Sequence, residues 1–419
     1  MLNSPVWHPF TQHGIEPPMR RAVSARGAFI TDAEGNRTFD AISSWWVTTH
    51  GHRHPTITAA IEQAARTLNQ VIFAEYTHDA AEQLARGLLA VAPPGLAQVF
   101  YSDSGSTAVE VALKMALGHF FNRGQKRHRI VVLEHSYHGD TIGTMSVGAR
   151  GVFNLPFTPL MFEVERLPFP DGSGARMLEA FETLCRSGDV AALLIEPLVL
   201  GAGGMCMYRP ALLTALRDIA TRHGVLLIAD EVMTGWGRTG TMFACSQAKI
   251  SPDILCTSKG LTGGSLPLAA TLATADIFES HLSTDRAKMF FHSSSYTANP
   301  IACSAGLANL EVWKTEPVQG RIDRIAHQLE GLLVATGNTV ENPRRTGTIA
   351  AVDLVVGDSG YLSDVAPRLR AFFRSRHMLI RPLGNVVYLM PPYCSGADEI
   401  GAAWDTILEA AEAVSKGKL

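Results

Sequence analysis

The sequence predicts an α/β protein with a mostly parallel sheet sandwiched by helices, followed by a smaller α+β C-terminal domain. Between about residues 54 and 310, short apolar runs recur between stretches of helical periodicity. Runs without polar alternation are typical of parallel strands buried on both faces and joined by helices. After about residue 315 the order changes to helix, strand, helix, a hairpin-like pair and a last helix, which is typical of an α+β unit.

The individual elements follow from the same patterns. The apolar runs predict strands at 98–101, 130–133, 191–195, 225–229, 253–257 and 268–271. Helical periodicity predicts helices at 78–91, 106–121, 210–223 and 297–314. The C-terminal part is predicted to hold helices at 318–334, 364–376 and 397–415, a strand at 347–356 and a hairpin-like pair around Gly384-Asn385.

The N-terminal segment is rich in aromatic residues and turn formers, and it predicts an irregular arm followed by a hairpin of residues 28–31 and 38–41. We therefore divide the chain into three parts. An arm and hairpin at 1–53 joins the small domain, a large cofactor-binding domain occupies 54–315, and the C-terminal small domain occupies 316–419.

Composition excludes several classes of protein. The 419 residues carry a net charge of −3 without a long Lys/Arg run, which argues against nucleic-acid binding. No apolar stretch is long enough to span a membrane, and the first residues lack the apolar core of a signal peptide. The six cysteines are scattered without zinc-like spacing, so we expect reduced thiols, no metal site and a cytoplasmic location.

Two charged residues follow predicted strands at the point where each strand ends. Asp230 follows the run 225–229, and Lys259 comes just after the run 253–257. Ligands of open α/β sheets bind beyond the carboxyl ends of the strands, so we expect both side chains at that edge. The pair suits pyridoxal 5'-phosphate (PLP), because a lysine bonds to the cofactor aldehyde while a carboxylate keeps the pyridine nitrogen protonated. Taken alone, such a pair is more often a surface salt bridge.

A cluster of small residues supplies a phosphate anchor. The strand 98–101 leads into Ser104-Gly105-Ser106 at the start of the helix 106–121. Backbone N–H groups and the dipole at a helix N-terminus favour an anion, so we expect Gly105 and Ser106 to hold the cofactor phosphate. An N-cap without a ligand is the commoner reason for such a sequence. Tyr137 follows the strand 130–133 and is placed either to cover the cofactor ring or to pack as a core aromatic.

These segments resemble a known family. Residues 228–240 (IADEVMTGWGRTG) and Ser258-Lys259-Gly260 resemble the signature of class III (subgroup II) aminotransferases, whose order is also followed at 104–106, 137–139 and 195–197. The resemblance extends from about residue 7 to the C-terminus. It implies a PLP-dependent transferase of fold type I, a homodimer with active sites shared between subunits, and catalytic roles for Lys259, Asp230 and Tyr137.

Within this family, four stretches resemble the members that serve biotin synthesis by transferring an amino group from S-adenosyl-L-methionine to 8-amino-7-oxononanoate. These stretches are residues 7–10, the group 43–46 with 50–51 and 54–55, residues 102–114, and 381–384 with 388–393. Arg381 offers a two-pronged partner for the carboxylate of the acceptor. The resemblance implies that the substrates contact Phe10, Trp45, Tyr137, Lys259, Ser293 and Arg381.

Three positions differ from related patterns. Phe10 stands where the family usually has tyrosine, which leaves the amino donor open. Ser293-Ser294-Ser295 replaces glycine-proline-threonine, and the hydroxyl kept at Ser295 implies that Ser294 and Ser295 bind the phosphate of the neighbouring subunit. Tyr388 occupies the place of an arginine that binds an α-carboxylate in ornithine-type relatives, which disfavours a 2-oxoglutarate-type partner.

Other functions remain compatible with these residues. They are a different class III ω-aminotransferase with another donor or acceptor, a PLP decarboxylase, racemase or aminomutase on the same fold, and a non-enzymatic protein that kept the fold. A dinucleotide-binding oxidoreductase is disfavoured, because no GxGxxG motif follows the first strand.

Overall fold

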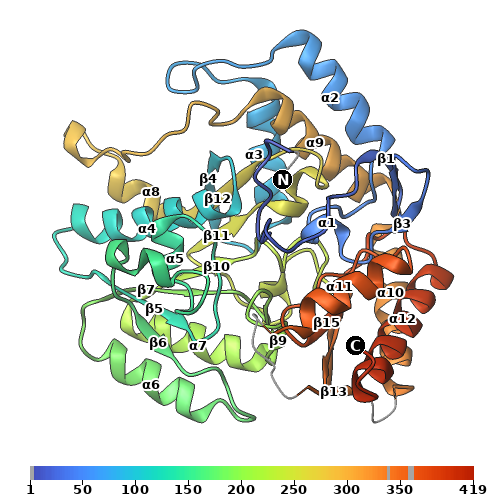
Figure 1. The fold of residues 1–419 in the computed structure, drawn as a ribbon. Helices are drawn as coiled ribbons and strands as arrows, with labels where there is room; N and C mark the ends of the chain where they lie inside the picture. The colour runs from blue at the N-terminus through green and yellow to red at the C-terminus, as the bar shows by residue number, and fades with distance from the viewer. Residues whose placement is uncertain (1–3, 337–339, 357–362) are drawn as a thin grey trace.

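The computed structural model describes residues 4–336, 340–356 and 363–419 (Figure 1). Within this part of the chain, the main sheet has seven strands in the order β4-β12-β11-β10-β7-β5-β6. The strands from β11 to β6 pair in parallel, and β12 runs antiparallel to both of its neighbours. The prediction of a mostly parallel sheet is therefore confirmed.

Every strand and helix predicted between residues 78 and 314 is present, with ends that differ by a few residues. The sheet strands are β4 (Leu96–Ser102), β5 (Arg129–Leu133), β6 (Glu165–Leu167), β7 (Val190–Ile195), β10 (Leu226–Asp230), β11 (Ile254–Thr257) and β12 (Ala269–Thr274). The predicted helices are α3 (Asp79–Val91), α4 (Gly105–Asn122), α7 (Pro210–His223) and α9 (Pro300–Thr315). The sequence patterns did not predict β6, the short pair β8 (Val199–Leu200) and β9 (Cys206–Met207), or the helices α2 (Pro55–Thr67), α5 (Ile142–Ser146), α6 (Ala175–Cys185) and α8 (Ala275–His281).

Both faces of the sheet are covered, which explains the apolar runs. In β10, Leu227 and Ala229 belong to a core cluster with residues of α6 and α7, whereas Ile228 belongs to a cluster with residues of α4. Because successive side chains of a strand point to opposite faces, a strand covered on both sides needs apolar residues at every position. None of the helices in the described residues has the length and apolar character needed to cross a bilayer.

The C-terminal part forms a three-stranded antiparallel sheet flanked by helices. Its elements are α10 (Val318–Val334), β13 (Val340–Thr346), β14 (Ile349–Leu354), α11 (Val365–Ser375), β15 (Val386–Leu389) and α12 (Ala397–Ser415). The strand predicted at 347–356 is present as β14, two residues shorter at each end, and the sequence patterns did not predict β13, which pairs with β14 across a turn at Gly347. The hairpin-like pair predicted around Gly384-Asn385 is present as a tight turn, in which Leu383 and Val386 form an antiparallel bridge. The pair is only one bridge long, because β15 pairs over its whole length with β14, where its residues 387–389 are buried.

The N-terminal segment packs against the C-terminal part. The predicted hairpin corresponds to β2 (Phe29–Asp32) and β3 (Arg37–Phe39), and an additional strand β1 (Ala22–Arg26) extends it to a three-stranded sheet. Ala28 and Phe39 share a core cluster with residues of β14 and α12, in agreement with the neighbouring blue and red segments in Figure 1. The domain boundaries near residues 53 and 315 stay a prediction.

A buried histidine gives the fold a pH dependence. Burial lowers the pKa of His50 to about 4 from an ordinary value of 6.5, and the charged groups that face it are His54, Glu316 and Arg321. Between these two pKa values the unfolded chain binds a proton that the folded chain does not. We therefore expect His50 to lower the free energy of unfolding by up to about 1.4 kcal/mol for each pH unit below 6.5. Above that pH this contribution is constant.

The measurement is denaturant unfolding of the wild type and of His50→Gln at a series of pH values across this window. Glutamine does not titrate, so the variant is expected to lose stability less steeply as the pH falls. Equal slopes in the two proteins would show that His50 is already protonated in the folded state.

Candidate active site

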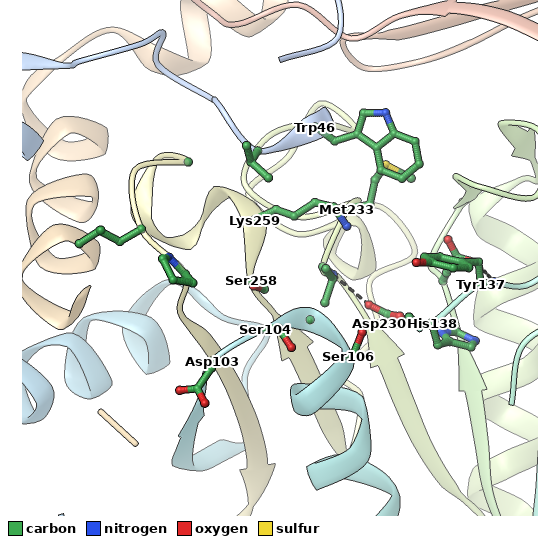
Figure 2. A pocket seen from close by; sticks show the side chains of 18 of the residues that line it. Trp46, Asp103, Ser104, Ser106, Tyr137, His138, Asp230, Met233, Ser258 and Lys259 are labelled. Carbon is green, nitrogen blue, oxygen red and sulfur yellow. Dashed lines mark hydrogen bonds and ion pairs between the residues drawn. The ribbon is translucent and has the colours of Figure 1, made fainter. Parts of the chain in front are cut away.

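A cavity of about 390 Å³ lies at the carboxyl ends of the central strands (Figure 2). Its walls come from the segments that follow β4, β5, β7, β10 and β11, and from the turn α1 (Ser43–Trp46). The residues that line it include Trp46, Asp103, Ser104, Gly105, Ser106, Tyr137, His138, Glu196, Asp230, Met233 and Lys259. The sheet thus brings together side chains that lie far apart in the sequence.

Asp230 and Lys259 reach this cavity from adjacent parallel strands. Asp230 ends β10, where it stands beside Cys256 of β11, and Lys259 follows three residues later in the 3₁₀ turn η3 (Lys259–Thr262). The Lys259 Nζ lies 5.3 Å from the centre of the Trp46 ring. Burial lowers the pKa of Lys259, while the negative charges of Asp230, Glu196 and Asp140 oppose this shift. A lowered pKa increases the fraction of neutral amine, the form that can accept a proton.

His138 holds the Asp230 carboxylate and was missed by the sequence analysis. Its Nδ1 donates to Asp230 Oδ2 over 2.7 Å, and the backbone N–H of Val232 donates to Asp230 Oδ1 over 3.1 Å. Both residues are buried. Both carboxylate oxygens of Asp230 therefore accept a hydrogen bond, which fixes the orientation of this side chain at the cavity wall. The available signal was the position of His138 directly after Tyr137, beyond a strand end.

The N-terminus of α4 lies at the cavity, where a phosphate-binding site was predicted. Ser104 caps the helix by a reciprocal pair of bonds, in which its Oγ accepts from Thr107 N over 3.2 Å and Thr107 Oγ1 accepts from Ser104 N over 2.9 Å. The first N–H groups of a helix have no partner within the helix, so Gly105 and Ser106 offer theirs to an anion. A Cβ at position 105 would lie 2.6 Å from Val232 Cγ1, which explains why glycine stands there.

Tyr137 and Glu196 both line the cavity, and Figure 2 shows Tyr137 on the same side as Asp230 and His138. The backbone N–H groups of Tyr137 and Gly201 donate to the two carboxylate oxygens of Glu196 over 2.9 and 3.0 Å. Burial raises the pKa of Glu196 to about 7, and burial also raises the pKa of the Tyr137 phenol, which therefore stays protonated. Glu196 thus fixes the backbone from which Tyr137 projects into the cavity.

The turn α1 decides which tryptophan reaches the site. Its residues Ser43, Ser44, Trp45 and Trp46 all have positive φ, between 46° and 76°, so the turn is left-handed. This conformation costs about 1–2 kcal/mol per residue and needs strong support. Ser43 Oγ donates to Met390 O and Ser44 Oγ donates to Asp40 Oδ2, each over 2.7 Å.

As a result, the two tryptophans have different surroundings. Trp46 is 5% exposed, lines the cavity and donates through its indole N–H to the Tyr388 hydroxyl over 2.9 Å. Trp45, the residue predicted to contact substrate, is 36% exposed and is absent from the cavity wall. Of the two adjacent tryptophans, Trp46 is therefore the one that lines the cavity.

Trp45 instead joins Phe10 and Arg381 in a second cluster. The Arg381 guanidinium lies 4.9 Å from the centre of the Trp45 ring and donates to Phe10 O over 3.1 Å. The rings of Phe10 and Trp45 meet edge to face at 5.5 Å. The structure thus brings three predicted substrate residues together, although none of them is part of the wall of the main cavity.

The serine segment Ser293–Ser295 does not line this cavity within one chain. Ser293 and Ser295 are exposed, and the Ser294 hydroxyl donates to Asp103, which belongs to the cavity wall. The predicted contact of Ser294 and Ser295 with a phosphate in the neighbouring subunit stays a prediction.

The residues around the cavity fit PLP. The Lys259 amine suits the cofactor aldehyde, the buried Asp230 carboxylate suits the pyridine nitrogen, and the free N–H groups at the N-terminus of α4 suit the phosphate. In the part of the chain that is described, no group of three His, Cys, Asp or Glu side chains is arranged to hold a metal ion.

Comparisons with known proteins agree with this chemistry. The model of the family described as aminotransferase class-III matches residues 10–411. A protein of Synechococcus elongatus named adenosylmethionine-8-amino-7-oxononanoate aminotransferase is 50% identical over 94% of this chain and 95% of its own length. A protein of the same name from Mycobacterium leprae is 38% identical over 97% of this chain and 94% of its own length.

Solved structures show the same fold. The adenosylmethionine-8-amino-7-oxononanoate aminotransferase of Methanocaldococcus jannaschii superposes with a TM-score of 0.92 at 32% identity, over 97% of this chain and 96% of its own. An amine transaminase from an uncultivated Pseudomonas species, solved with PLP bound, has a TM-score of 0.90 at 32% identity, over 97% of this chain and 98% of its own.

Proposed function

Because the chain belongs to the class-III aminotransferase family, we propose that it transfers the amino group of S-adenosyl-L-methionine to 8-amino-7-oxononanoate, a step of biotin synthesis. It uses PLP as its cofactor. The main support for this type of reaction is that Lys259, Asp230 and the N-terminus of α4 line the same cavity. The similarity to relatives of that name over nearly the whole chain supports the choice of substrates.

Bound at this site, PLP supplies an aldehyde that exchanges for an amino group and a ring that withdraws electrons from the carbon losing its proton. The Lys259 Nζ would accept the proton that the donor carbon loses and would carry it during the transfer. Asp230, held by His138, would serve as the carboxylate partner of the cofactor's ring nitrogen. Tyr137 and Trp46 line the cavity near these groups, and the N–H groups of Gly105 and Ser106 hold the phosphate.

In the same proposal, Arg381 binds the carboxylate of 8-amino-7-oxononanoate. Its guanidinium is stacked on Trp45 and anchored to the Phe10 carbonyl, so it is held in place before the substrate arrives. Trp45 and Phe10 contribute an apolar surface beside it, which suits the long aliphatic chain of the acceptor. Ser293 is the remaining residue that is predicted to contact the substrates.

The experiment that tests the function separates the two halves of the reaction. The holoenzyme is mixed with S-adenosylmethionine, lysine, alanine or glutamate in turn, and the cofactor absorption band is followed before 8-amino-7-oxononanoate is added. We expect S-adenosylmethionine alone to convert the band and the acceptor to restore it with formation of 7,8-diaminononanoate. Conversion by another donor only would identify a different aminotransferase, and release of carbon dioxide would identify a decarboxylase.

An Arg381→Gln variant tests the acceptor. Loss of a charge-assisted pair of about 1.5–3 kcal/mol is expected to weaken binding of the acceptor, so that its KM rises by a factor of about 10 to 150. The matched control is the carboxamide of the same acceptor, whose KM should change little because it lacks the carboxylate charge that Arg381 would bind. An equal effect on both compounds would exclude carboxylate binding by Arg381.

We further propose a homodimer with shared active sites and a cytoplasmic location. The exposed side chains of Met289, Phe291 and Tyr296 flank the serine segment 293–295. A second copy of the chain that covered these apolar side chains would lie against the segment, which supports the predicted contact of Ser294 and Ser295 with the partner's phosphate. The six free cysteines agree with a reducing compartment. Sedimentation should give the mass of two chains.

A further inference from the structure

The turn that carries Lys259 has an unusual backbone and tight surroundings. Lys259 itself has a φ of +28°, in the left-handed region, and the turn ends at Gly263 with a φ of +64°. A Cβ at Gly263 would lie 2.6 Å from Ile57 Cδ1 of α2, and a Cβ at Gly260 would lie 2.7 Å from Trp236 Cβ. A backbone of this kind persists only where the surrounding structure holds it in place.

Asn309 of α9 is hydrogen-bonded to the backbone of this turn. Its side chain is fully buried, and its Nδ2 donates to the carbonyl oxygens of Gly260 and Leu261 over 2.9 and 3.0 Å. These are the carbonyls of the two residues that directly follow Lys259. The Gly260 carbonyl also accepts from Gly263 N over 3.0 Å within the turn, whereas the Leu261 carbonyl has only the Asn309 amide among the hydrogen bonds described. Loss of the amide would therefore leave the buried Leu261 carbonyl without a partner and remove one of the two bonds to Gly260 O, so we expect the turn to loosen.

His50 fixes the orientation of Asn309. The amide nitrogen must face the two carbonyls, so Oδ1 faces the Nε2 of His50 at a distance of 2.8 Å. This bond requires a proton on Nε2, because Oδ1 can only accept. The other ring nitrogen, Nδ1, is buried and has no hydrogen-bond partner among the residues described. The ring edges of Trp313 and Tyr393 pack around the imidazole.

We propose that Asn309, oriented by His50, is a positioning residue that sets where the Lys259 amine stands relative to Asp230. It touches neither substrate nor cofactor and acts through the backbone of the turn η3. His50-Gly51 belongs to the stretches that carry the family resemblance, and the bond from His50 to Asn309 explains why a histidine is needed at this position. The inference rests on the proposed role of Lys259 as the cofactor lysine.

The experiment compares two variants that break the network with one that keeps it. Asn309→Ser removes the amide, and His50→Leu removes the donor that orients it. His50→Gln keeps a donor N–H near the position of Nε2. Val312→Ala, a cavity-forming change in the same buried face of α9, is the matched control for a general loss of stability.

Two quantities are measured. The first is the pH midpoint at which the cofactor absorption band of the substrate-free holoenzyme changes, which reports the proton affinity of the lysine nitrogen. The second is the hydrogen exchange of the amides of residues 258–265 in the cofactor-free protein. When the turn η3 is no longer held by Asn309, the Lys259 nitrogen can shift toward the carboxylates of Asp230 and Glu196, which stabilise its protonated form. We therefore expect Asn309→Ser and His50→Leu to raise the midpoint by about one unit, a tenfold change in proton affinity, and to accelerate exchange of the turn.

The two controls are expected to keep the wild-type midpoint, even though Val312→Ala unfolds more easily. The inference is overturned if the midpoint of the network variants does not rise while cofactor is bound, or if Val312→Ala raises it equally. If Asn309→Ser does not fold, the comparison of His50→Leu with His50→Gln decides. Failure of the cofactor to attach to the wild-type Lys259 would instead contradict the proposed function.

Discussion

Lys259→Ala is expected to lose transamination by at least about 10²–10⁴-fold in kcat, because the amine that moves the proton is gone. The structure places this amine in the cavity beside Trp46, where burial lowers its pKa. The reaction of the wild type should therefore become faster as the pH rises through that pKa, since the neutral amine is the active form. A small primary amine added to the variant should restore part of the rate.

The measurement combines single-turnover kinetics with mass spectrometry after borohydride reduction. Reduction should fix the cofactor covalently to Lys259 in the wild type and leave the variant unlabelled. Lys126→Ala, at an exposed position, is the control for a general effect of losing a lysine. Turnover of Lys259→Ala at a rate near that of the wild type would remove the basis of the proposed function.

The second large effect is expected for Asp230→Asn, with a loss on the order of 10²–10³ in kcat. Asparagine has nearly the same shape, and its oxygen can still accept from His138 Nδ1, so the fold should be kept. What is lost is the negative charge that keeps the ring nitrogen protonated. The cofactor band should therefore change in position, and the first half-reaction should slow.

The neighbouring Glu231 provides the matched control. It is also fully buried, but it accepts from Thr234 Oγ1 and Cys245 N and is not part of the cavity wall. Glu231→Gln is expected to leave the cofactor band and kcat within about threefold of the wild type, the range of a remote change. An Asp230→Asn enzyme that behaves in the same way would show that the ring nitrogen does not depend on this carboxylate.

Much of the fold was predictable because the relevant signals are local. The helices at 210–223, 318–334 and 397–415 have the predicted bounds, since apolar spacing together with Pro or Gly at the ends defines them within one segment. The placement of Asp230 and Lys259 at one sheet edge was predictable for a different reason. Strands that pair in parallel, as β10 and β11 do, present their carboxyl ends on the same side of the sheet.

Predictions were incomplete where a partner distant in sequence decides the outcome. The turn at Gly384-Asn385 was predictable from its residues, but the pairing of β15 with β14 was not, because that central strand is distant in sequence and offers both hydrogen bonds and burial. Trp45 and Trp46 cannot be told apart by residue type. The left-handed turn of residues 43–46, held by Asp40 and Met390, turns Trp46 to the cavity and Trp45 to Arg381.

The sequence by itself determined the fold class, the family and the two charged side chains of the site, because these depend on periodicity and on the order of motifs along the chain. Only the tertiary structure decided that His138 holds Asp230, that Trp46 faces Lys259, and that Asn309 supports the Lys259 turn. Each of these contacts joins segments separated by tens to hundreds of residues. Its geometry depends on how the sheet and helices pack, which no local pattern encodes.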